Sequence, residues 1–459
     1  MDIVMIDIGG HDNGEMVISR FFVQGLFLFV LRFTLDSSNP ASLQSRIVNC
    51  FFEHPVLHVD VTFADRTKMR EAINQAANYA IPRCMGNPSS KAPDAVIDVT
   101  GDGREIISYI ICNESALYNE YLSWLQPLDN TLKSSQRKNR TFRFIDRASL
   151  SIIDTVVAGH GTIAIVRNPF TSDPTTMEGK YVFKGEHFSD FVTDPEVCAH
   201  IIRARYDEIA ALDAMPPHPN IIPPSSIFVT TPSAYPPGMH SNTVICGTLQ
   251  PFYAKGDLDK YLRVNDASLP LKAKWCYQLV SATHHAYFIG KTYHMDLKPP
   301  NLLLDENLDL VVIDWENSGA NISVLPPEAD GTFDVSLRQL FNGEKVIQYK
   351  KYNGPERSNN LVRPTWNVFP IWNIECRQAI ELAQVYSFGR AIWMILTGVL
   401  NDELEDKDIW WTLKMEKAIP ESWRKVVENC VRKDPNSRMS MEKLLIFWRD
   451  AQKGGDFLL

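Results

Sequence analysis

Cysteine is scarce in this sequence, and its few occurrences are scattered. The 459 residues include eight cysteines. They are Cys50, Cys84, Cys112, Cys198, Cys246, Cys276, Cys376 and Cys430. A disulfide framework needs far denser usage, and no two of these residues have the spacing of metal ligands. The pattern excludes a disulfide-rich secreted scaffold and predicts reduced thiols in a cytoplasmic or nuclear protein.

Long apolar runs are also missing. The most apolar run, Phe21 to Leu31, has eleven residues and lies between Arg20 and Arg32. A membrane-spanning helix needs about 20 apolar residues, and the run starts too late, after an acidic lead, to be a signal peptide. The sequence therefore predicts a buried strand here and no transmembrane segment or membrane partner.

The sequence also has no excess of positive charge. Lys and Arg number 46 against 55 Asp and Glu, which gives a formal net charge of −9. This balance argues against a nucleic-acid partner bound through bulk charge. The local basic stretch from Lys133 to Arg143 is interpreted as a solvated linker.

The length predicts two domains, because one compact core of ordinary size does not use 459 residues. A polar stretch, Asn130–Arg140, is the predicted boundary between residues 1–140 and residues 145–450. Residues 1–140 carry no chemical motif and are expected to form an accessory α+β domain of unknown function. They are a candidate region for binding a protein partner. Its expected strands are Met16–Leu35 and Val56–Phe63, and its expected helices are Arg66–Tyr79 and Glu114–Leu125.

After the boundary, β-type segments come before helical ones. The expected strands are Phe142–Ile145, Ile152–Val157, Thr162–Arg167, Lys180–Lys184, Ile227–Thr230 and Thr243–Gln250. One helix is expected among them at Pro195–Met215, and the pattern is mainly helical from Leu258 onward. A small β-rich part followed by a larger helical part is therefore expected.

One run carries most of the chemistry: His294-Met295-Asp296-Leu297-Lys298-Pro299-Pro300-Asn301. It resembles the catalytic loop H-R-D-L-K-x-x-N of the eukaryotic-type protein kinase superfamily, and its Lys-Pro pair resembles the serine/threonine branch. The resemblance implies that Asp296 orients or accepts the hydroxyl proton of the substrate and that Lys298 neutralises charge on the transferred phosphoryl group. Asn301 would hold a metal ion.

Asp314-Trp315-Glu316 follows thirteen residues after Asn301. It resembles the D-F-G triplet, in which the aspartate binds Mg²⁺, so Asp314 is a predicted metal ligand. Trp315 can take the packing role of Phe. Glu316 replaces a permissive glycine and is expected to bring a second carboxylate near the metal. Ile-Asp-Trp-Glu also resembles the metal-binding run of aminoglycoside and choline phosphotransferases.

Two glycines between expected strands, Gly159 and Gly161, are candidates for contact with phosphates, because a backbone without Cβ can close over them. This signal is weak by itself, since a Gly-x-Gly hairpin is commoner than a nucleotide loop. Ala164 takes the third glycine position of the kinase pattern, and Val166 would cover the adenine ring. Adenine is also expected against residues Thr248–Phe252.

Tyr181-Val182-Phe183-Lys184 resembles the V-A-I-K of the third kinase strand, so Lys184 is expected to reach the nucleotide phosphates. Glu208, ten residues before His218, is its expected partner. Asp207 is the competing carboxylate. The alternative interpretation is that Lys184 and Glu208 are ordinary surface charges.

Later segments also resemble a kinase. Tyr352–Glu356 resembles the A-P-E box, and Val385–Gly389 resembles the D-V-Y-S-F-G helix of the large lobe. The resemblance implies a buried ion pair between Glu356 and Arg438. The segment from Asn317 to Tyr352 is expected to be long and irregular.

Three residues depart from the pattern. Met295 replaces an Arg that, in the kinase pattern, binds a phosphate on the activation loop. Regulation of activity by phosphorylation of that loop is therefore not expected in the usual way. Gln384 stands at an Asp position of the large-lobe helix, so an amide is expected to anchor the catalytic loop. Tyr349 is interpreted as occupying the place of a Thr that aligns the catalytic Asp and Lys.

Taken together, the resemblance implies an α+β, two-lobed protein-kinase-like fold with an N-terminal accessory domain. The implied activity is ATP- and Mg²⁺-dependent phosphorylation of Ser or Thr on a protein substrate. Two alternatives remain: a pseudokinase that binds ATP or acts as a scaffold, and a small-molecule phosphotransferase. The substrate, the regulation, the oligomeric state and the role of residues 1–140 are left open.

Overall fold

The fold is α+β and divides into two compact units. The computed structural model describes residues 3–10, 14–23, 27–52, 66–85, 95–101, 106–112, 115–131, 140–150, 152–157, 162–167, 169–170, 179–186, 188, 191, 195–234, 242–317, 323–339, 341, 343, 345–355, 368–399 and 408–454. Unit 1 contains residues 1–203 and 225–252, and unit 2 contains residues 204–224 and 253–459. The division falls inside one helix, α7 (Pro195–Ala214).

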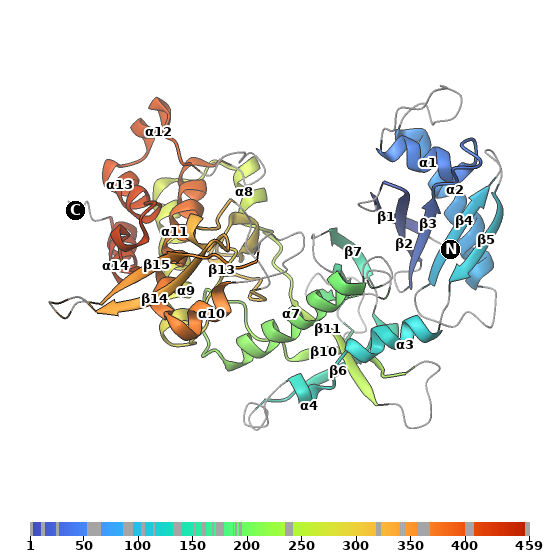
Figure 1. Cartoon of the computed structure of the whole chain (residues 1–459), viewed down its shortest axis with the longest axis horizontal. Helices are drawn as coiled ribbons and strands as arrows, with labels where there is room; N and C mark the ends of the chain where they lie inside the picture. Colours follow the sequence, from blue (N-terminus) through green and yellow to red (C-terminus); the bar gives the residue numbers. More distant parts are fainter. Residues whose placement is uncertain are drawn as a thin grey trace. The chain divides into compact units, whose positions relative to one another are not determined.

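Unit 1 contains a five-stranded sheet in the order β1-β2-β3-β4-β5 (Figure 1). Its elements are β1 (Ile3–Gly10), β2 (Met16–Val23), β3 (Phe27–Thr34), β4 (Ala95–Gly101), β5 (Ile106–Cys112), α1 (Leu43–Phe52) and α2 (Arg66–Met85). Only the β3–β4 pairing is parallel. Paired residues Val17 and Phe33, and Phe21 and Phe29, are buried with residues of α1 and α2 in one core. The two-residue repeat of the strands therefore directs one face of the sheet toward these helices.

The apolar run Phe21–Leu31 is divided between two strands, which corrects the expectation of one. Strands β2 and β3 pair antiparallel, with Phe22 opposite Leu28 and Val23 opposite Phe27. A single strand of eleven residues would exceed the usual strand length of about 5–6 residues. The helices expected near residues 66–79 and 114–125 are α2 and α3 (Ser115–Trp124). The strand expected at residues 56–63 lies outside the described residues.

A six-stranded sheet, in the order β6-β10-β11-β9-β8-β7, forms the rest of the β-structure of unit 1. Its strands are β6 (Arg143–Asp146), β7 (Ile152–Val157), β8 (Thr162–Arg167), β9 (Lys180–Gly185), β10 (Ile227–Pro232) and β11 (Thr243–Pro251). All six lie within two residues of the expected strands. The ring of Phe183 packs closely over Gly185 and Gly247, where an added Cβ would stand 2.5 and 2.4 Å from it.

Helix α3 packs through aromatic side chains on the residues that follow β9 of this second sheet. The Tyr118 and Phe188 rings are 4.8 Å apart, and the Tyr121 and Phe191 rings are 5.8 Å apart. The Tyr121 hydroxyl donates a hydrogen bond to the Glu186 carbonyl at 2.9 Å. Although α3 precedes the expected boundary at residues 130–140, its contacts are with the β-rich part that follows that boundary.

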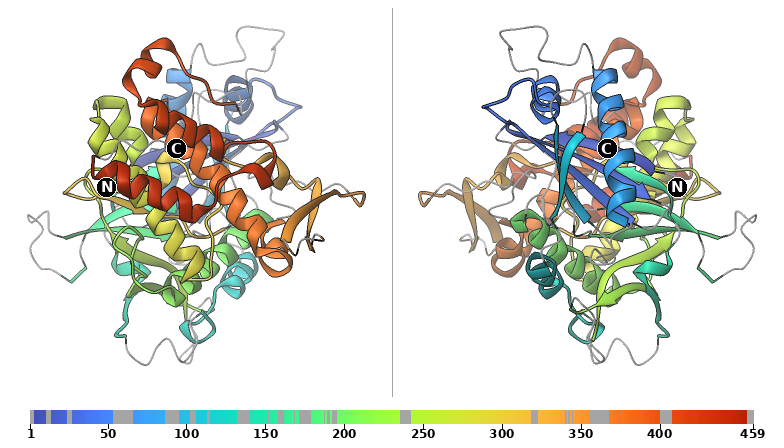
Figure 2. Two further views of the ribbon diagram at one scale, coloured as in Figure 1. Left: turned by 90° about the vertical axis from the view of Figure 1, so that its left-hand side faces the viewer. Right: turned by 90° about the vertical axis from the view of Figure 1, so that its right-hand side faces the viewer.

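Unit 2 is mainly helical. Its helices, after the C-terminal part of α7, are α8 (Leu258–Val264), α9 (Leu269–Phe288), α10 (Val368–Glu375), α11 (Arg377–Thr397), α12 (Leu413–Ala418), α13 (Glu421–Cys430) and α14 (Met441–Gln452). Helix α11 is buried on all sides from Leu382 to Leu396, as expected of a central helix. Helices α9 and α13 contact α11, and α14 packs mainly on α9 (Figures 1 and 2).

Short elements complete unit 2. In its described part, three single turns of 3₁₀-helix are η4 (Pro299–Asn301), η5 (Pro327–Ala329) and η7 (Pro435–Ser437). The two-stranded sheet β12–β13 (Leu302–Leu304 and Leu310–Val312) follows η4 directly. No helix in the described part of the chain is long and apolar enough to cross a membrane.

A β-hairpin corrects the expectation of an irregular segment between Asn317 and Tyr352. Strands β14 (Phe333–Gln339) and β15 (Lys345–Lys351) pair antiparallel over their whole length. Val335 and Ile347 are buried, whereas Asp334 and Lys350 on the other face are exposed. The hairpin extends away from the helices of unit 2 (Figure 2).

Candidate active site

Asp296, Lys298 and Asn301 lie within hydrogen-bonding distance of one another. Lys298 Nζ is 2.6 Å from Asp296 Oδ2. Asn301 Nδ2 donates to the backbone oxygen of Asp296 at 2.8 Å and to Oδ2 at 3.1 Å. The Asp296 carboxylate is therefore oriented by an ammonium and an amide. Because Nδ2 of Asn301 is engaged in this way, Oδ1 is the side-chain atom that Asn301 can offer to a cation.

The β12–β13 pair places Asp314 beside this loop. Asn301 is the last residue of η4, and its carbonyl accepts a hydrogen bond from Ile313 N at 3.1 Å. Asp314 comes next, with a φ of 69° in the left-handed region. A left-handed non-glycine residue costs on the order of 1–3 kcal/mol and persists where its surroundings hold it, which is common at functional sites. Asn301 and Asp314, both predicted metal ligands, thus lie on connected backbone segments.

His294 connects the loop to the Asp-Trp-Glu turn. Its Nδ1 accepts a hydrogen bond from Asp296 N at 3.1 Å, and its Nε2 contacts the Ile313 carbonyl at 2.8 Å. Since a carbonyl only accepts, the proton is on Nε2 and the ring is neutral. Burial lowers the pKa of His294, which favours this neutral form. The ring also meets Trp315 edge to face, with the ring centroids 4.8 Å apart. The motif resemblance assigned no role to His294.

Gln384 anchors the catalytic loop, as expected from the sequence. Its Oε1 accepts a hydrogen bond from His294 N at 3.1 Å. Gln384 is 1% exposed on the central helix α11, so the loop is attached to the core of unit 2. Met295, at the predicted Arg position, is buried among apolar residues.

Glu208 is directed at the Asp-Trp-Glu turn. Its Oε1 accepts a hydrogen bond from Trp315 N at 3.1 Å, and its Oε2 accepts one from Arg205 at 3.1 Å. Glu208 is buried whereas the competing Asp207 is exposed. Glu316, which was expected near a metal, is paired with Arg205 at 3.3 Å. Sequence reasoning did not single out Arg205, although its spacing of one helical turn from Glu208 was visible.

The other predicted site residues belong to unit 1. Lys184 is 7% exposed and pairs with Thr248 of β11 and Ile163 of β8 in the sheet register. Ala164 and Val166 are fully buried on β8. Gly159 and Gly161 lie outside the described residues. Because Lys184 and Glu208 belong to different units, their pairing remains a prediction.

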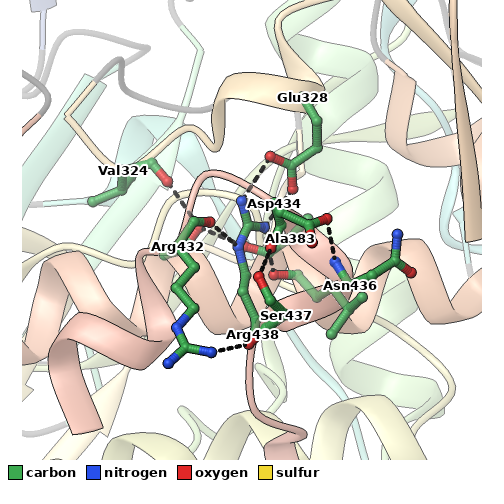
Figure 3. A network of polar contacts seen from close by, with 10 residues as sticks. Val324, Glu328, Ala383, Arg432, Asp434, Asn436, Ser437 and Arg438 are labelled. Carbon is green, nitrogen blue, oxygen red and sulfur yellow. Dashed lines mark hydrogen bonds and ion pairs between the residues drawn. The ribbon is translucent and has the colours of Figure 1, made fainter. Parts of the chain in front are cut away.

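Arg438 pairs with Glu328, which corrects the expected partner Glu356 (Figure 3). Nη1 and Nη2 of Arg438 bind the two carboxylate oxygens of Glu328 at 2.5 and 2.8 Å. Glu356 lies beyond what the structure describes. Between Asp314 and helix α11 the chain contains two Pro-Glu pairs, Pro327-Glu328 and Pro355-Glu356, and spacing alone did not separate them. Pro326-Pro327-Glu328 is therefore the A-P-E-like box.

This assignment also corrects the role of Tyr349. Tyr349 lies in β15, after Glu328, and its ring packs against Trp372 with the ring centroids 6.0 Å apart. Burial raises the pKa of its hydroxyl. Tyr349 is a packing residue of the hairpin and does not occupy the Thr position before the A-P-E-like box.

Helix α11 holds the chain just before that box. Arg390 Nε donates to the Ser323 carbonyl and Ser387 Oγ donates to the Val324 carbonyl, both at 2.8 Å. All four groups are buried. The segment between Asp314 and Glu328 is therefore only thirteen residues long and is fixed to the core at its end.

The predicted metal ligands carry oxygen donors, which suit Mg²⁺ better than a transition metal. The described residues contain no group of three or more His, Cys, Asp or Glu side chains that could hold an ion. Asp314 and Asn301 provide one carboxylate and one amide oxygen. Mg²⁺ commonly uses one or two such ligands and completes its shell with water and phosphate oxygens.

Comparison with known proteins relates the chain to kinases. No protein-family model matches it. It is 27% identical over 179 residues to CBL-interacting serine/threonine-protein kinase 20 of Arabidopsis thaliana (38% of this chain, 34% of that protein). It is 30% identical over 200 residues to CBL-interacting serine/threonine-protein kinase 19 of the same plant (43% and 36%). A probable serine/threonine-protein kinase of Dictyostelium discoideum is 23% identical over 210 residues (40% and 10%).

The chain thus spans about a third of the length of the two Arabidopsis kinases that it matches. These similarities make it a distant relative of serine/threonine protein kinases.

Proposed function

We propose that the protein is an ATP-dependent protein kinase that transfers the γ-phosphate of ATP to Ser or Thr of a protein substrate in the cytoplasm or nucleus. The observation that supports this best is the cluster of Asp296, Lys298 and Asn301 beside Asp314. It combines a carboxylate for a hydroxyl proton, a cation for phosphate charge and two oxygen ligands for a metal. Phosphoryl transfer needs these groups and little covalent chemistry from the protein.

In the proposed reaction, the substrate hydroxyl oxygen forms a bond to the γ-phosphorus, and its proton passes to the Asp296 carboxylate. The bond between the γ-phosphorus and the bridging oxygen breaks, and ADP leaves with the electron pair. Lys298, 2.6 Å from Asp296, would neutralise charge on the transferred group. Asp314 and Asn301 Oδ1 would hold Mg²⁺, which neutralises charge on the phosphate oxygens.

The pseudokinase alternative is weakened at each residue that suggested it. Gln384 still accepts the hydrogen bond from His294 N. Tyr349 packs within the hairpin, where it does not affect the catalytic loop directly. Glu316 is neutralised by contact with Arg205. The buried Glu328–Arg438 pair and the helices of unit 2 favour a protein kinase over a small-molecule phosphotransferase.

The test is transfer of labelled γ-phosphate from Mg-ATP to a Ser/Thr peptide library by the full chain. Asp296→Ala is expected to lower kcat by about 10²-fold or more, because a positioned acid–base group contributes about 10²–10⁴-fold. Asp266→Ala, a matched change at an exposed loop, is expected to keep the wild-type rate within about twofold.

Mg-ATP should also raise the melting temperature of both wild type and Asp296→Ala. Stabilisation by Mg-ATP without any transfer would identify a pseudokinase. Transfer to a soluble alcohol or amino sugar, but to no peptide, would identify a small-molecule phosphotransferase.

A further inference from the structure

Arg205 lies between two buried carboxylates. Its Nη1 is 3.1 Å from Glu208 Oε2 and 3.3 Å from Glu316 Oε2. The side chains of Arg205, Glu208 and Glu316 are only 5%, 3% and 9% exposed. One guanidinium nitrogen therefore bridges a carboxylate of helix α7 and a carboxylate of the Asp-Trp-Glu turn.

The contacts close a ring. Glu208 uses its second oxygen, Oε1, to accept the backbone N–H of Trp315 at 3.1 Å. Glu316 follows Trp315 in the chain and returns to Arg205. Helix α7 thus holds the turn at two adjacent residues, once through a backbone hydrogen bond and once through an ion pair. A turn held at one point could rotate about that point, whereas a turn held at two points cannot.

The charges of the three side chains explain why a cation lies at the centre of this ring. Two carboxylates that are both withdrawn from water need a cation between them, and removing it leaves buried charge without compensation. Arginine suits the position because it stays charged when it is buried, and because Nη1 carries two N–H groups that can face two carboxylates. Charge-assisted hydrogen bonds of this kind are about twice as strong as neutral ones.

The ring acts next to a predicted metal ligand. Asp314 immediately precedes Trp315 and has a left-handed φ of 69°. A glycine in place of Glu316 would leave the turn free to change conformation. The Glu316 side chain, attached to Arg205, instead restricts it to one arrangement.

We propose that Arg205 and Glu316 are positioning residues that hold Glu208 and Asp314 ready for phosphoryl transfer without phosphorylation of the segment between Asp314 and Glu328. This rests on the proposed kinase function. A site that works without this phosphorylation is also consistent with Met295, because an uncharged side chain cannot bind a phosphate on that segment.

The test measures kcat and the Mg²⁺ concentration for half-maximal transfer in the full chain after phosphatase treatment. Glu316→Gln and Arg205→Lys are gentle changes chosen to preserve folding. Each is expected to lower kcat about tenfold and to raise the half-maximal Mg²⁺ concentration about fivefold, because a misplacement of about 1 Å can cost about 10²-fold in rate and these changes displace the groups by less. The kcat of the double variant should be at most about threefold below that of the poorer single variant, because both changes affect the same contact.

Arg203→Met, at an exposed position of the same helix, is the control and should match wild type within about twofold. Folded variants with an unchanged Mg²⁺ requirement would overturn the positioning role, as would wild type that loses its activity on phosphatase treatment. If wild type transfers no phosphate, the proposed function fails by itself. The same variants are then compared by the Mg²⁺ dependence of binding to a fluorescent ATP analogue, and equal dependence in all of them would reject the positioning role.

Discussion

At the residue scale, the buried His294 and the half-buried His218 make the stability of the protein depend on pH. Burial lowers the pKa of His294, and burial with the neighbouring His285 lowers that of His218 to about 4. Each ring accepts a backbone N–H on Nδ1, from Asp296 and from Asn220, which requires the neutral form. In the unfolded chain both histidines would titrate near their ordinary pKa of about 6.5.

The unfolded state therefore binds protons first as the pH falls. The stabilisation that the neutral His294 and His218 contribute to the folded state is complete above about pH 6.5. It is expected to decrease from there toward pH 4. We predict a lower melting temperature at pH 5.0 than at pH 7.5. His218→Gln, which keeps hydrogen-bonding groups but does not titrate, should reduce this difference. An equal difference in wild type and variant would contradict the assignment.

At the element scale, strands and helices were predicted well where the apolar pattern was clear. Strand β7 has the predicted bounds, Ile152–Val157, and α7 ends one residue before the predicted end. The hairpin β14–β15 was missed although Phe333, Val335 and Leu337 alternate with polar residues, because the segment was interpreted as part of an activation loop. The choice of Glu356 as the partner of Arg438 caused that interpretation.

The Glu328–Arg438 pair leads to a prediction about stability. The side chain of Arg438 is 0% exposed and that of Glu328 is 6% exposed. Removing one partner of such a buried pair costs about 3–5 kcal/mol. We expect Glu328→Gln and Arg438→Met to lower the free energy of unfolding by this order, measured by chemical denaturation.

Two controls make that measurement specific. Lys433→Met, at an exposed neighbouring position, should change the free energy of unfolding by less than about 0.5 kcal/mol. Glu356→Gln should do the same, because both terminal nitrogens of Arg438 bind Glu328. A large loss in Glu356→Gln with none in Glu328→Gln would restore the pairing expected from the sequence.

At the scale of the whole molecule, helix α3 belongs by contact to the β-rich part that follows it in the chain. Tyr118 and Tyr121 pack on Phe188 and Phe191. A truncated protein of residues 141–459 would expose these two phenylalanines, at a cost of about 3 kcal/mol or more. A protein of residues 113–459 keeps α3.

We therefore predict a clearly higher melting temperature for residues 113–459 than for residues 141–459. The single substitution Tyr121→Ala in the full chain should reproduce part of the loss, because it removes one ring and the hydrogen bond to Glu186. Equal melting temperatures for the two truncated proteins would place the domain boundary at residues 130–140, as the polar composition suggested.

The sequence was sufficient for the groups of the candidate site that are close together in the chain. Asp296, Lys298 and Asn301 fall within six residues, so their proximity follows from local geometry once the loop is recognised. The role of Gln384 could also be anticipated, because it stands at an Asp position of the large-lobe helix that the kinase resemblance assigns to the anchoring of the loop, and a buried polar side chain needs a partner.

Only the tertiary structure decided the long-range pairings. Arg438 had two Pro-Glu candidates, and the link between Arg205 and Glu316 joins residues more than a hundred positions apart. Ion pairs of this kind depend on which helices pack together, and charge has no periodicity in sequence that reveals its partner. Packing around α11 selects Glu328 for Arg438, and the approach of α7 to the Asp-Trp-Glu turn gives Arg205 its two carboxylates.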